Sequence, residues 1–350
     1  MIKIGIVGAG GYAGITLIQI LLRHPEAKIV WAMSEDAHKG KKLDELYPHL
    51  QGEIDLTIQT LADLDKVLNK IDLVFLALPH GIALNYVPQM LKAGKKVVDL
   101  GADYRFNDEA VFKKWYNVDH KDKGLLKEAV FGLPEFYRKE IKQAKLIANP
   151  GCYPTAAILG LAPLIKDKLI EADGIVVNAA SGTTGAGRGV SIKTHFCERN
   201  EGFEAYNVTG HRHMGEIDYQ LTRISSGPVK ATFVPHLLPM NRGILSTIYA
   251  DIKNEKQKIK NNELINLYKK FYKNEPFVRI REGQLPNTKF VAGTNFCDIA
   301  VQVNEEKGKV IVIAAIDNLV KGAAGQAVHN MNLMCGFEET TGLKQIALYP

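Results

Sequence analysis

The chain has 350 residues, of which 46% are hydrophobic and 23% charged, and its formal net charge is +6. This length and composition are typical of a globular protein of about two domains. No apolar run is long enough to cross a membrane, and no helix-turn-helix, zinc-finger or basic–aromatic pattern occurs, so we expect neither a membrane nor a nucleic-acid partner. The lysine excess indicates a solvated surface whose mild positive field also attracts anionic small molecules.

The cysteine pattern indicates a reducing compartment. Cys152, Cys197, Cys297 and Cys335 lie far apart and form no C-x-x-C pair, which argues against a disulfide framework and against a zinc site. Met1 leads directly into a strand-like run instead of a secretory signal. We therefore expect a cytoplasmic protein without a resident metal.

A glycine-rich turn follows the first predicted strand, residues 2–7. Residues 8–14 read GAGGYAG and match the G-x-G-x-x-A variant of the dinucleotide fingerprint. Gly8 permits a tight turn, and Gly10 lets the backbone approach a pyrophosphate at the N-terminus of the following helix, residues 12–23. The residues expected to contact the cofactor here are Gly8, Gly10, Gly11, Tyr12 and Ala13.

The end of the second strand favours NADP(H). This strand is predicted at residues 28–33, and Ser34 follows it where NAD enzymes usually carry an acidic residue for the ribose 2′-hydroxyl. A serine in a basic neighbourhood suits a 2′-phosphate, whereas Glu35 and Asp36, one and two positions late, keep NAD open. The basic residues nearby are Lys39, Lys41 and Lys42.

Further strands at residues 72–77 and 96–100, each preceded by a helical pattern, predict a parallel, doubly wound sheet of the Rossmann type. Such sheets bind ligands at the carboxyl ends of their strands. Pro79 is therefore expected to contact the cofactor, and the adjacent His80 either does so or is an ordinary loop residue. Arg105 follows the later strand and is a candidate anion-binding residue, with a surface arginine as the alternative.

Residues 147–155 carry the strongest chemical signal. They place Cys152 at a turn set by Pro150 and Gly151, directly ahead of an apolar run, residues 156–165, that is typical of a helix. Unpaired N–H groups and the positive end of the helix dipole favour a thiolate there. Cys152 is therefore predicted to perform covalent chemistry; the alternative is a buried cysteine that acts as a small hydrophobic residue.

A strand at residues 174–180 runs into a loop rich in glycine and hydroxyl groups, residues 181–189. Backbone N–H groups in such a loop form an anion nest, and Arg188 adds a bidentate grip on phosphate. We expect Gly182 to contact the cofactor and Arg188 to bind substrate, with an ordinary flexible turn as the alternative.

Two histidines and a glutamate lie within residues 210–217. In a helix or tight turn Glu216 approaches His211, which would fix the imidazole tautomer and raise its basicity. His211 is the expected acid/base residue, and His213 either binds substrate or takes that role instead. A metal site is disfavoured because no third ligand lies nearby, and structural roles are the remaining alternative.

The rest of the second half predicts a mixed sheet with helices on one side, a sheet that could also form a subunit interface. Its strands are expected at residues 232–234, 247–252, 297–303 and 310–316. Residues 317–328 follow as a helix of small side chains, which permit close approach to a ligand or another element. We expect this helix to return to the first domain near the nicotinamide, with Asn318 and Gly322 contacting the cofactor; a plain packing helix is the competing interpretation.

The order of these motifs resembles the N-acetyl-gamma-glutamyl-phosphate reductases, NADP-dependent enzymes of arginine biosynthesis, over essentially the whole chain. The segments that carry the resemblance are the glycine fingerprint and residues 100–105, 147–163, 181–188, 211–213 and 318–326. One departure is Gly215, where that family has proline, and it affects loop stiffness more than chemistry. The resemblance implies the semialdehyde dehydrogenase architecture, with an NADP-binding Rossmann domain (1–149), a catalytic and dimerisation α/β domain (150–317) and a C-terminal helix (318–350) that returns to the first domain.

By the same resemblance, the reaction is the NADPH-dependent reduction of N-acetyl-L-glutamyl 5-phosphate to the 5-semialdehyde through a thioester on Cys152. His211 would be the acid/base and Glu216 its orienting partner, and Ser34 and Arg188 match positions for NADP and phosphate contacts. The implied assembly is a homodimer or homotetramer.

Other functions stay open. One alternative is a related acyl-phosphate reductase, either aspartate-semialdehyde dehydrogenase or the aminoadipyl-phosphate reductase of lysine synthesis. A second is a non-covalent reductase in which Cys152 is merely packed, and a third is an NADP-sensing module without turnover. The residues do not decide which of Arg105 and Arg188 binds phosphate and which binds carboxylate.

Overall fold

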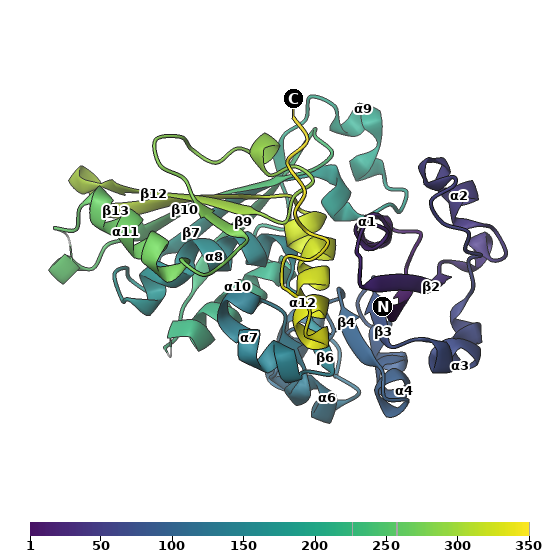
Figure 1. Ribbon diagram of the computed structural model, residues 1–350. Helices are drawn as coiled ribbons and strands as arrows, with labels where there is room; N and C mark the ends of the chain where they lie inside the picture. The colour runs from purple at the N-terminus through teal and green to yellow at the C-terminus, as the bar shows by residue number, and fades with distance from the viewer. Residues whose placement is uncertain (226, 257, 350) are drawn as a thin grey trace. The chain divides into compact units, whose positions relative to one another are not determined.

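A computed structural model describes residues 1–225, 227–256 and 258–349 (Figure 1). The chain forms two compact units, each with its own sheet. The first consists of Met1–Pro150 and Ala323–Lys344, and the second of Gly151–Gly322 together with the residues from Gln345 onward. Within the described ranges, no helix combines the length and the hydropathy needed to cross a membrane.

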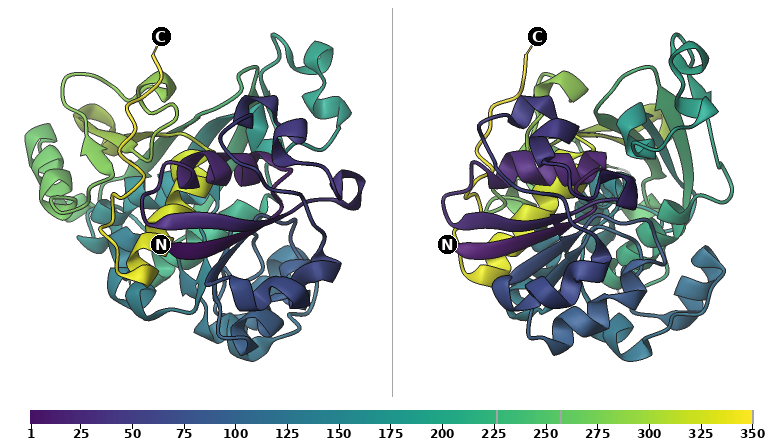
Figure 2. Two further views of the ribbon diagram at one scale, coloured as in Figure 1. Left: turned by 45° about the vertical axis from the view of Figure 1, so that its right-hand side comes forward. Right: turned by 90° about the vertical axis from the view of Figure 1, so that its right-hand side faces the viewer.

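The first unit is built on a six-stranded parallel sheet in the order β2-β1-β3-β4-β6-β5; the purple strands in Figure 2 are its N-terminal pair. Its strands are β1 (Ile2–Val7), β2 (Ala27–Met33), β3 (Leu73–Leu76), β4 (Lys96–Asp99), β5 (Val130–Phe131) and β6 (Leu146–Ala148). From β1 the chain adds β2 on one side and then continues with β3 on the other side, so the strand order reverses between β1 and β3. Doubly wound sheets bind ligands at such a reversal. The predicted Rossmann-type sheet is confirmed. It has two additional strands, β5 and β6, which are too short to show a pattern in the sequence.

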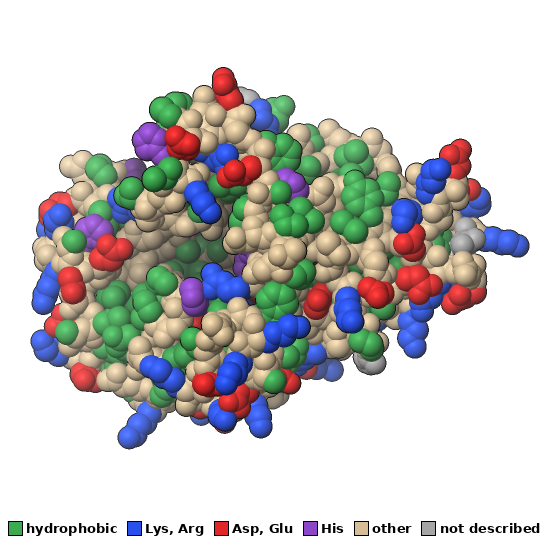
Figure 3. All heavy atoms as spheres, turned by 180° about the vertical axis from the view of Figure 1, so that it is seen from behind, with side chains coloured by type: hydrophobic (Ala, Val, Ile, Leu, Met, Phe, Trp, Pro, Cys, Tyr) green, Lys and Arg blue, Asp and Glu red, His purple; other side chains and the backbone are tan. Residues whose placement is uncertain are grey.

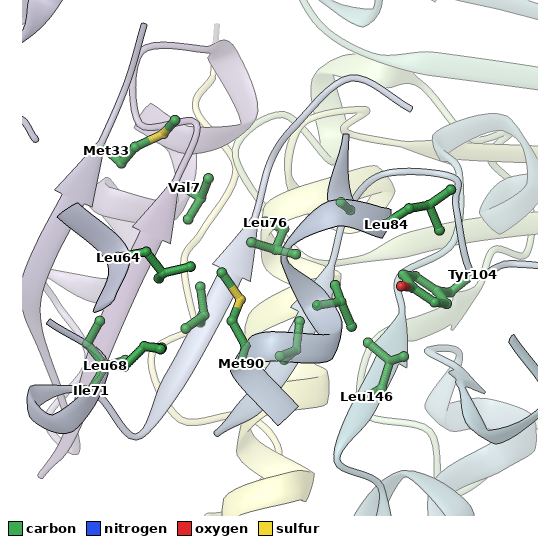
Figure 4. Close-up of a cluster of buried hydrophobic side chains, with 14 of the residues drawn as sticks. Val7, Met33, Leu64, Leu68, Ile71, Leu76, Leu84, Met90, Tyr104 and Leu146 are labelled. Atoms are coloured by element: carbon green, nitrogen blue, oxygen red, sulfur yellow. The ribbon is translucent and has the colours of Figure 1, made fainter. Parts of the chain in front are cut away.

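The helices of this unit are mostly short. They are α1 (Tyr12–Leu21), α2 (Leu43–Leu46), α3 (Leu64–Val67), α4 (Val87–Lys92), α5 (Glu109–Tyr116), α6 (Lys123–Glu128), α7 (Pro134–Gln143) and α12 (Gly325–Cys335). Side chains from α3 and α4 pack against the strands in one apolar core, where Leu64 and Met90 lie near Val7 and Leu76 (Figure 4). Each such side chain contributes about 1.5–3 kcal/mol when fully buried, so this core holds the strand ends firmly.

Helix α12 is buried along ten of its eleven residues, although several of them are polar. It packs against α1 and α7, beside the latter in Figure 1. Gln326 and Asn330 both donate to the carbonyl of Gly132, and His329 bonds to Glu339, which also pairs with Arg138. These partners satisfy polar groups whose burial would otherwise destabilise the unit.

The second unit contains a mixed seven-stranded sheet in the order β11-β12-β13-β10-β7-β9-β8. Its strands are β7 (Ile175–Gly182), β8 (Glu204–Ala205), β9 (Ala231–Leu238), β10 (Ile244–Asp251), β11 (Val278–Ile280), β12 (Cys297–Asn304) and β13 (Lys309–Ile316). The five strands that were predicted in this half are present as β7, β9, β10, β12 and β13, and the mixed sheet is confirmed.

The helices of the second unit are α8 (Cys152–Lys166), α9 (Phe196–Arg199), α10 (Arg212–Ser225) and α11 (Asn261–Phe271). Helix α8 packs on β10 and β13 and also contacts α10 and α11, so these three helices cover one face of the sheet. Every residue of α8 from Tyr153 to Ile165 is buried, so this helix lies in the core of the unit. Alternate residues of β9 and β10 stay partly exposed on the other face.

The predicted helix over residues 317–328 is wrong at its start. A π-helix spans Val320–Ala324, and the α-helical pattern begins only at Gly325. The reason is the Asp317 side chain, which accepts hydrogen bonds from the N–H groups of Leu319 and Val320, while Gly322 donates to the carbonyl of Asp317 five residues back. Small residues alone did not reveal this wider turn.

Charged side chains of both signs are interspersed over the face seen in Figure 3. Several lysines pair with carboxylates, as Lys42 does with Asp55 at 3.0 Å. This distribution fits the interpretation of the lysine excess as dispersed, solvated charge.

Candidate active site

The glycine turn after β1 is shaped by two close approaches of backbone to backbone. Gly8 has a φ of +92°, and a Cβ atom there would lie 2.3 Å from the carbonyl oxygen of Ala77. A Cβ on Gly14 would lie 2.1 Å from the carbonyl oxygen of Gly8. Helix α1 begins at Tyr12, and its N-cap residue, Gly11, supplies no side-chain acceptor. The turn therefore presents a bare helix N-terminus beside glycines, and this fits the pyrophosphate of a dinucleotide.

Ser34 lies directly against this turn. It is 3% exposed, and a Cβ on Gly10 would lie 2.2 Å from its hydroxyl oxygen. The hydroxyl is also 3.0 Å from Nδ1 of His38, and the Tyr47 hydroxyl donates to the carbonyl of Gly10. The fold thus joins the fingerprint to the end of β2. His38 and Tyr47 were missed from the sequence, because nothing in their local pattern marks them.

The carboxyl end of β4 carries a buried acidic and basic cluster. Arg105 is 6% exposed and donates to the carbonyls of Leu100 and Asn149, so the alternative of a surface arginine is wrong. Two effects raise the pKa of Asp99 to about 7: its burial is the larger, and repulsion from Asp103 is the smaller. Pro79 and His80 follow β3, and the His80 ring lies 5.8 Å from that of Tyr116. Their contacts with a cofactor stay predictions.

Cys152 is the first residue of α8 and is half-buried. The residue before it, Gly151, is the N-cap, and its N–H donates to the Glu216 carboxyl at 2.8 Å. The Gly151 carbonyl accepts a bond from the Thr155 hydroxyl at 2.9 Å. The predicted helix after Cys152 is confirmed, and it begins at the cysteine itself. Cys152 therefore lies in the first turn of the helix, where backbone N–H groups lack acceptors within the helix.

Aromatic rings and imidazoles gather beside this helix start. The His211 ring lies 4.8 Å from the His213 ring and 5.6 Å from the Tyr206 ring, centroid to centroid. Tyr153 contacts both histidines at 5.9 Å, and its hydroxyl lies 3.1 Å from that of Tyr206 and donates to the carbonyl of His236. Burial raises the pKa of Tyr206 to about 12, so its phenol is neutral at pH 7.

Tyr206 was missed from the sequence because it lies on a separate segment from the histidines. Strand β8 pairs with β9 and delivers this side chain to the cluster. Only the sheet pairing reveals that placement.

The expectation that His211 is unusually basic is wrong. The pKa of His211 is lowered to about 4, mainly by burial and to a smaller extent by repulsion from Arg212. Glu216, which was expected to raise it, is 1% exposed and accepts the Gly151 N–H. Helix α10 begins just after His211 and directs Glu216 toward the start of α8. The role of Glu216 in orienting His211 stays a prediction.

The remaining predicted residues lie at the end of β7 and on loops of the second unit. Gly182 packs against the turn before β10, since a Cβ on it would lie 2.6 Å from the carbonyl oxygen of Asn241. Arg188 is exposed, just beyond a short 3₁₀ turn. Asn318 is 2% exposed; its amide accepts from the N–H of Gly243 and donates to the hydroxyl of Thr184. None of these contacts tests the predicted ligand roles.

No group of three histidine, cysteine or carboxylate side chains suited to a metal ion occurs among the residues that the structure describes. The four cysteines are free thiols.

Comparison with known families gives the class of the chain. Residues 3–144 match the profile described as semialdehyde dehydrogenase, NAD binding domain, and residues 152–318 match semialdehyde dehydrogenase, dimerisation domain. Solved structures agree in fold: aspartate semialdehyde dehydrogenase II of Vibrio cholerae has a TM-score of 0.72 at 15% identity, covering 96% of this chain and 98% of its own. The Candida albicans aspartate semialdehyde dehydrogenase with NADP has a TM-score of 0.69 at 16% identity, over 96% and 98%. The class is therefore the semialdehyde dehydrogenases, and the first unit is a nicotinamide-cofactor domain.

Curated relatives narrow the assignment. The N-acetyl-gamma-glutamyl-phosphate reductase of Citrifermentans bemidjiense is 52% identical over 352 residues, covering 100% of both chains. That of Pelotomaculum thermopropionicum is 49% identical over 350 residues, covering 100% of this chain and 99% of the other. The chain belongs to the N-acetyl-gamma-glutamyl-phosphate reductase family of the semialdehyde dehydrogenases.

His211 is expected to titrate with a pKa of about 4, well below its usual 6.5. Since the folded pKa lies below the unfolded one, the unfolded chain binds the proton first, and the His211 contribution to stability falls as the pH drops from 6.5 toward 4. An NMR titration of the imidazole C–H signals, assigned with His211→Gln, measures the midpoint directly. A midpoint at or above the usual value would contradict the burial argument.

Proposed function

We propose that this chain catalyses the NADPH-dependent reduction of N-acetyl-L-glutamyl 5-phosphate to N-acetyl-L-glutamate 5-semialdehyde, with release of phosphate. The observation that carries the proposal is the half-buried Cys152 as the first residue of α8, followed directly by Tyr153, whose ring contacts His211 and His213 and whose hydroxyl lies 3.1 Å from that of Tyr206. Relatives about half identical over their full length carry the name of that reductase.

In the first step the sulfur of Cys152 attacks the acyl carbon. A C–S bond forms, the bond to the phosphate oxygen breaks, and a thioester remains. His211 is neutral at pH 7 because of its lowered pKa, so it can accept the thiol proton and pass it to the departing phosphate. Backbone N–H groups at the start of α8 stabilise the transient oxyanion, and such donors contribute about 3–4 kcal/mol each.

In the second step the thioester carbon is reduced. NADPH, when bound, supplies the hydride. The residues at the start of α8 hold the resulting hemithioacetal oxygen as its negative charge develops. When the C–S bond breaks, Cys152 leaves as a thiolate, the aldehyde is released, and His211 can return a solvent proton to the sulfur.

We further propose roles for the remaining predicted residues. Arg105 and Arg188 hold the phosphate and the substrate carboxylate, His213 contacts substrate, and Glu216 orients His211. The burial of Arg105 supports its part, because a cation removed from water attracts an anion more strongly. The proposed cofactor contacts are Gly8, Gly10, Gly11, Tyr12, Ala13, Ser34, Pro79, Gly182, Asn318 and Gly322.

The proposed cofactor is NADP(H), supported by Ser34 at the end of β2 in place of an acidic residue. The proposed assembly is a homodimer or homotetramer, supported by the match of residues 152–318 to a dimerisation domain. Four free thiols support a reducing compartment such as the cytoplasm.

The substrate assignment is tested by a panel of semialdehydes assayed with phosphate and NADP⁺ in the reverse direction. N-acetyl-glutamate semialdehyde should exceed aspartate semialdehyde and the aminoadipate analogue by about 10²-fold or more in kcat/KM. A preference for aspartate semialdehyde would assign the chain to a different reductase of the same fold.

Cys152→Ser should lower turnover by a factor of about 10⁴ or more, because a serine hydroxyl there is a far weaker nucleophile. NADPH binding, followed by nicotinamide fluorescence, should be nearly unchanged. Cys197→Ser replaces an exposed cysteine of the same unit and should leave the rate intact. Substantial activity in Cys152→Ser would reject the thioester, as would the absence of an acyl-enzyme mass in trapped wild-type protein.

The enzyme should use NADPH more efficiently than NADH, by about tenfold or more in kcat/KM, because lysines near Ser34 favour the 2′-phosphate. Lys39→Ala and Lys41→Ala remove exposed cations near Ser34 and should lower the ratio of kcat/KM for NADPH to that for NADH. Lys28→Ala, on the exposed side of β2, is the matched control and should not change it. Equal efficiencies in the wild-type enzyme would favour NAD instead.

A further inference from the structure

We propose that Gly322 positions the nucleophile: its lack of a side chain is what allows Cys152 to hold its place at the start of α8. The argument rests on the proposed covalent role of Cys152 and gives Gly322 a function in addition to the proposed contact with the cofactor. Gly322 lies in the π-helix Val320–Ala324. Segments of π-helix are rare and often occur at functional sites.

The contact between the two residues is very close. A Cβ atom built on Gly322 would lie 2.7 Å from Cβ of Cys152 and 3.1 Å from its Cα. The next nearest atom is Cδ1 of Ile316, at 3.3 Å. The first two atoms belong to the rigid part of the nucleophile, so any larger residue at position 322 must displace either the cysteine or the π-helix.

The cysteine side of this contact is held firmly. Helix α8 is buried from Tyr153 to Ile165, which prevents the helix from sliding away. Its N-cap, Gly151, is bonded through its N–H to Glu216 and through its carbonyl to Thr155. Cys152 therefore has little freedom to retreat as a whole residue.

The Gly322 side is held equally firmly. Gly322 donates to the carbonyl of Asp317, whose side chain accepts from the N–H groups of Leu319 and Val320 on one oxygen and of Gly293 on the other. Asn318, the residue after Asp317, accepts a hydrogen bond from the N–H of Gly243 and donates one to the hydroxyl of Thr184. With both sides fixed, a methyl group at position 322 is accommodated only by a shift of the backbone at Cys152 or in the π-helix, and a shift of the Cys152 backbone displaces the sulfur relative to the N–H groups of the helix start.

The test compares Gly322→Ala with the wild-type chain and with Gly160→Ala. Gly160 lies in α8, the helix that begins at Cys152. A Cβ on Gly160 would lie 3.1 Å from Cδ1 of Ile248, which is the mobile end of a side chain far in sequence from the nucleophile. Iodoacetamide labelling, resolved by peptide mass spectrometry across pH, reports the reactivity of Cys152, with exposed Cys197 as the internal reference. Labelling needs neither substrate nor turnover, so its result is independent of the proposed reaction.

Gly322→Ala should slow the labelling of Cys152 at pH 7 by about tenfold and move its pH midpoint upward, because the thiolate loses the helix dipole. The kcat should fall by about 100-fold, with the KM for the acyl phosphate changed by less than about threefold. Labelling of Cys197 should not change, and Gly160→Ala should behave as the wild type. A Cys152 labelling profile identical to that of the wild type, with weakened NADPH binding, would assign Gly322 to the cofactor and overturn the proposal.

A thermal measurement keeps the proposal testable if Gly322→Ala folds poorly. The Tm loss caused by Gly322→Ala is measured in the wild-type background and in the Cys152→Gly background, which removes the Cβ that the new methyl group meets. A smaller loss in the second background is the coupling expected of direct contact. Equal losses would show that the methyl group meets something else, and the proposal would fail.

Discussion

The hydrogen bond between the N–H of Gly151 and the buried carboxyl of Glu216 is the contact on which the proposed chemistry depends. Gly151 has no side chain with which to cap α8, so a residue of α10 supplies the partner from outside the helix. The bond fixes the helix end one residue before Cys152, while the packing of Gly322 limits the cysteine from another direction. A nucleophile held from both sides loses little entropy when it attacks, which is how positioning accelerates a reaction.

The surroundings of the cysteine keep the neighbouring groups neutral. Burial lowers the pKa of His211 to about 4 and raises that of Tyr206 to about 12, so near pH 7 neither carries a charge. Their neutrality leaves the substrate phosphate and the negative charge that develops during the attack as the charges that the helix N-terminus and the arginines would act upon. A weakly basic imidazole also releases a proton readily, which suits a group that transfers a proton from sulfur to a departing phosphate.

Local sequence was sufficient for the features that depend on neighbours in the chain. The glycine turn, the helix that follows the Cys152 turn, the parallel sheet and the strands β9, β10, β12 and β13 follow from short patterns that short-range sterics enforce. The burial of Arg105 and the π-helix at Val320–Ala324 do not, because they depend on partners brought in by the fold. The strands β5 and β6 were too short to show a period.

The amino-acid sequence by itself determined the class of the fold and the family, and it singled out Cys152 as the predicted nucleophile, since each is written in contiguous motifs. Only the tertiary structure decided that Glu216 bonds to Gly151, that Tyr206 joins the imidazoles and that Gly322 packs on Cys152. It also decided the low basicity of His211, because the cost of charging a group depends on how much water the surrounding side chains exclude. Most of these effects depend on partners that the fold brings in, and no local pattern records them.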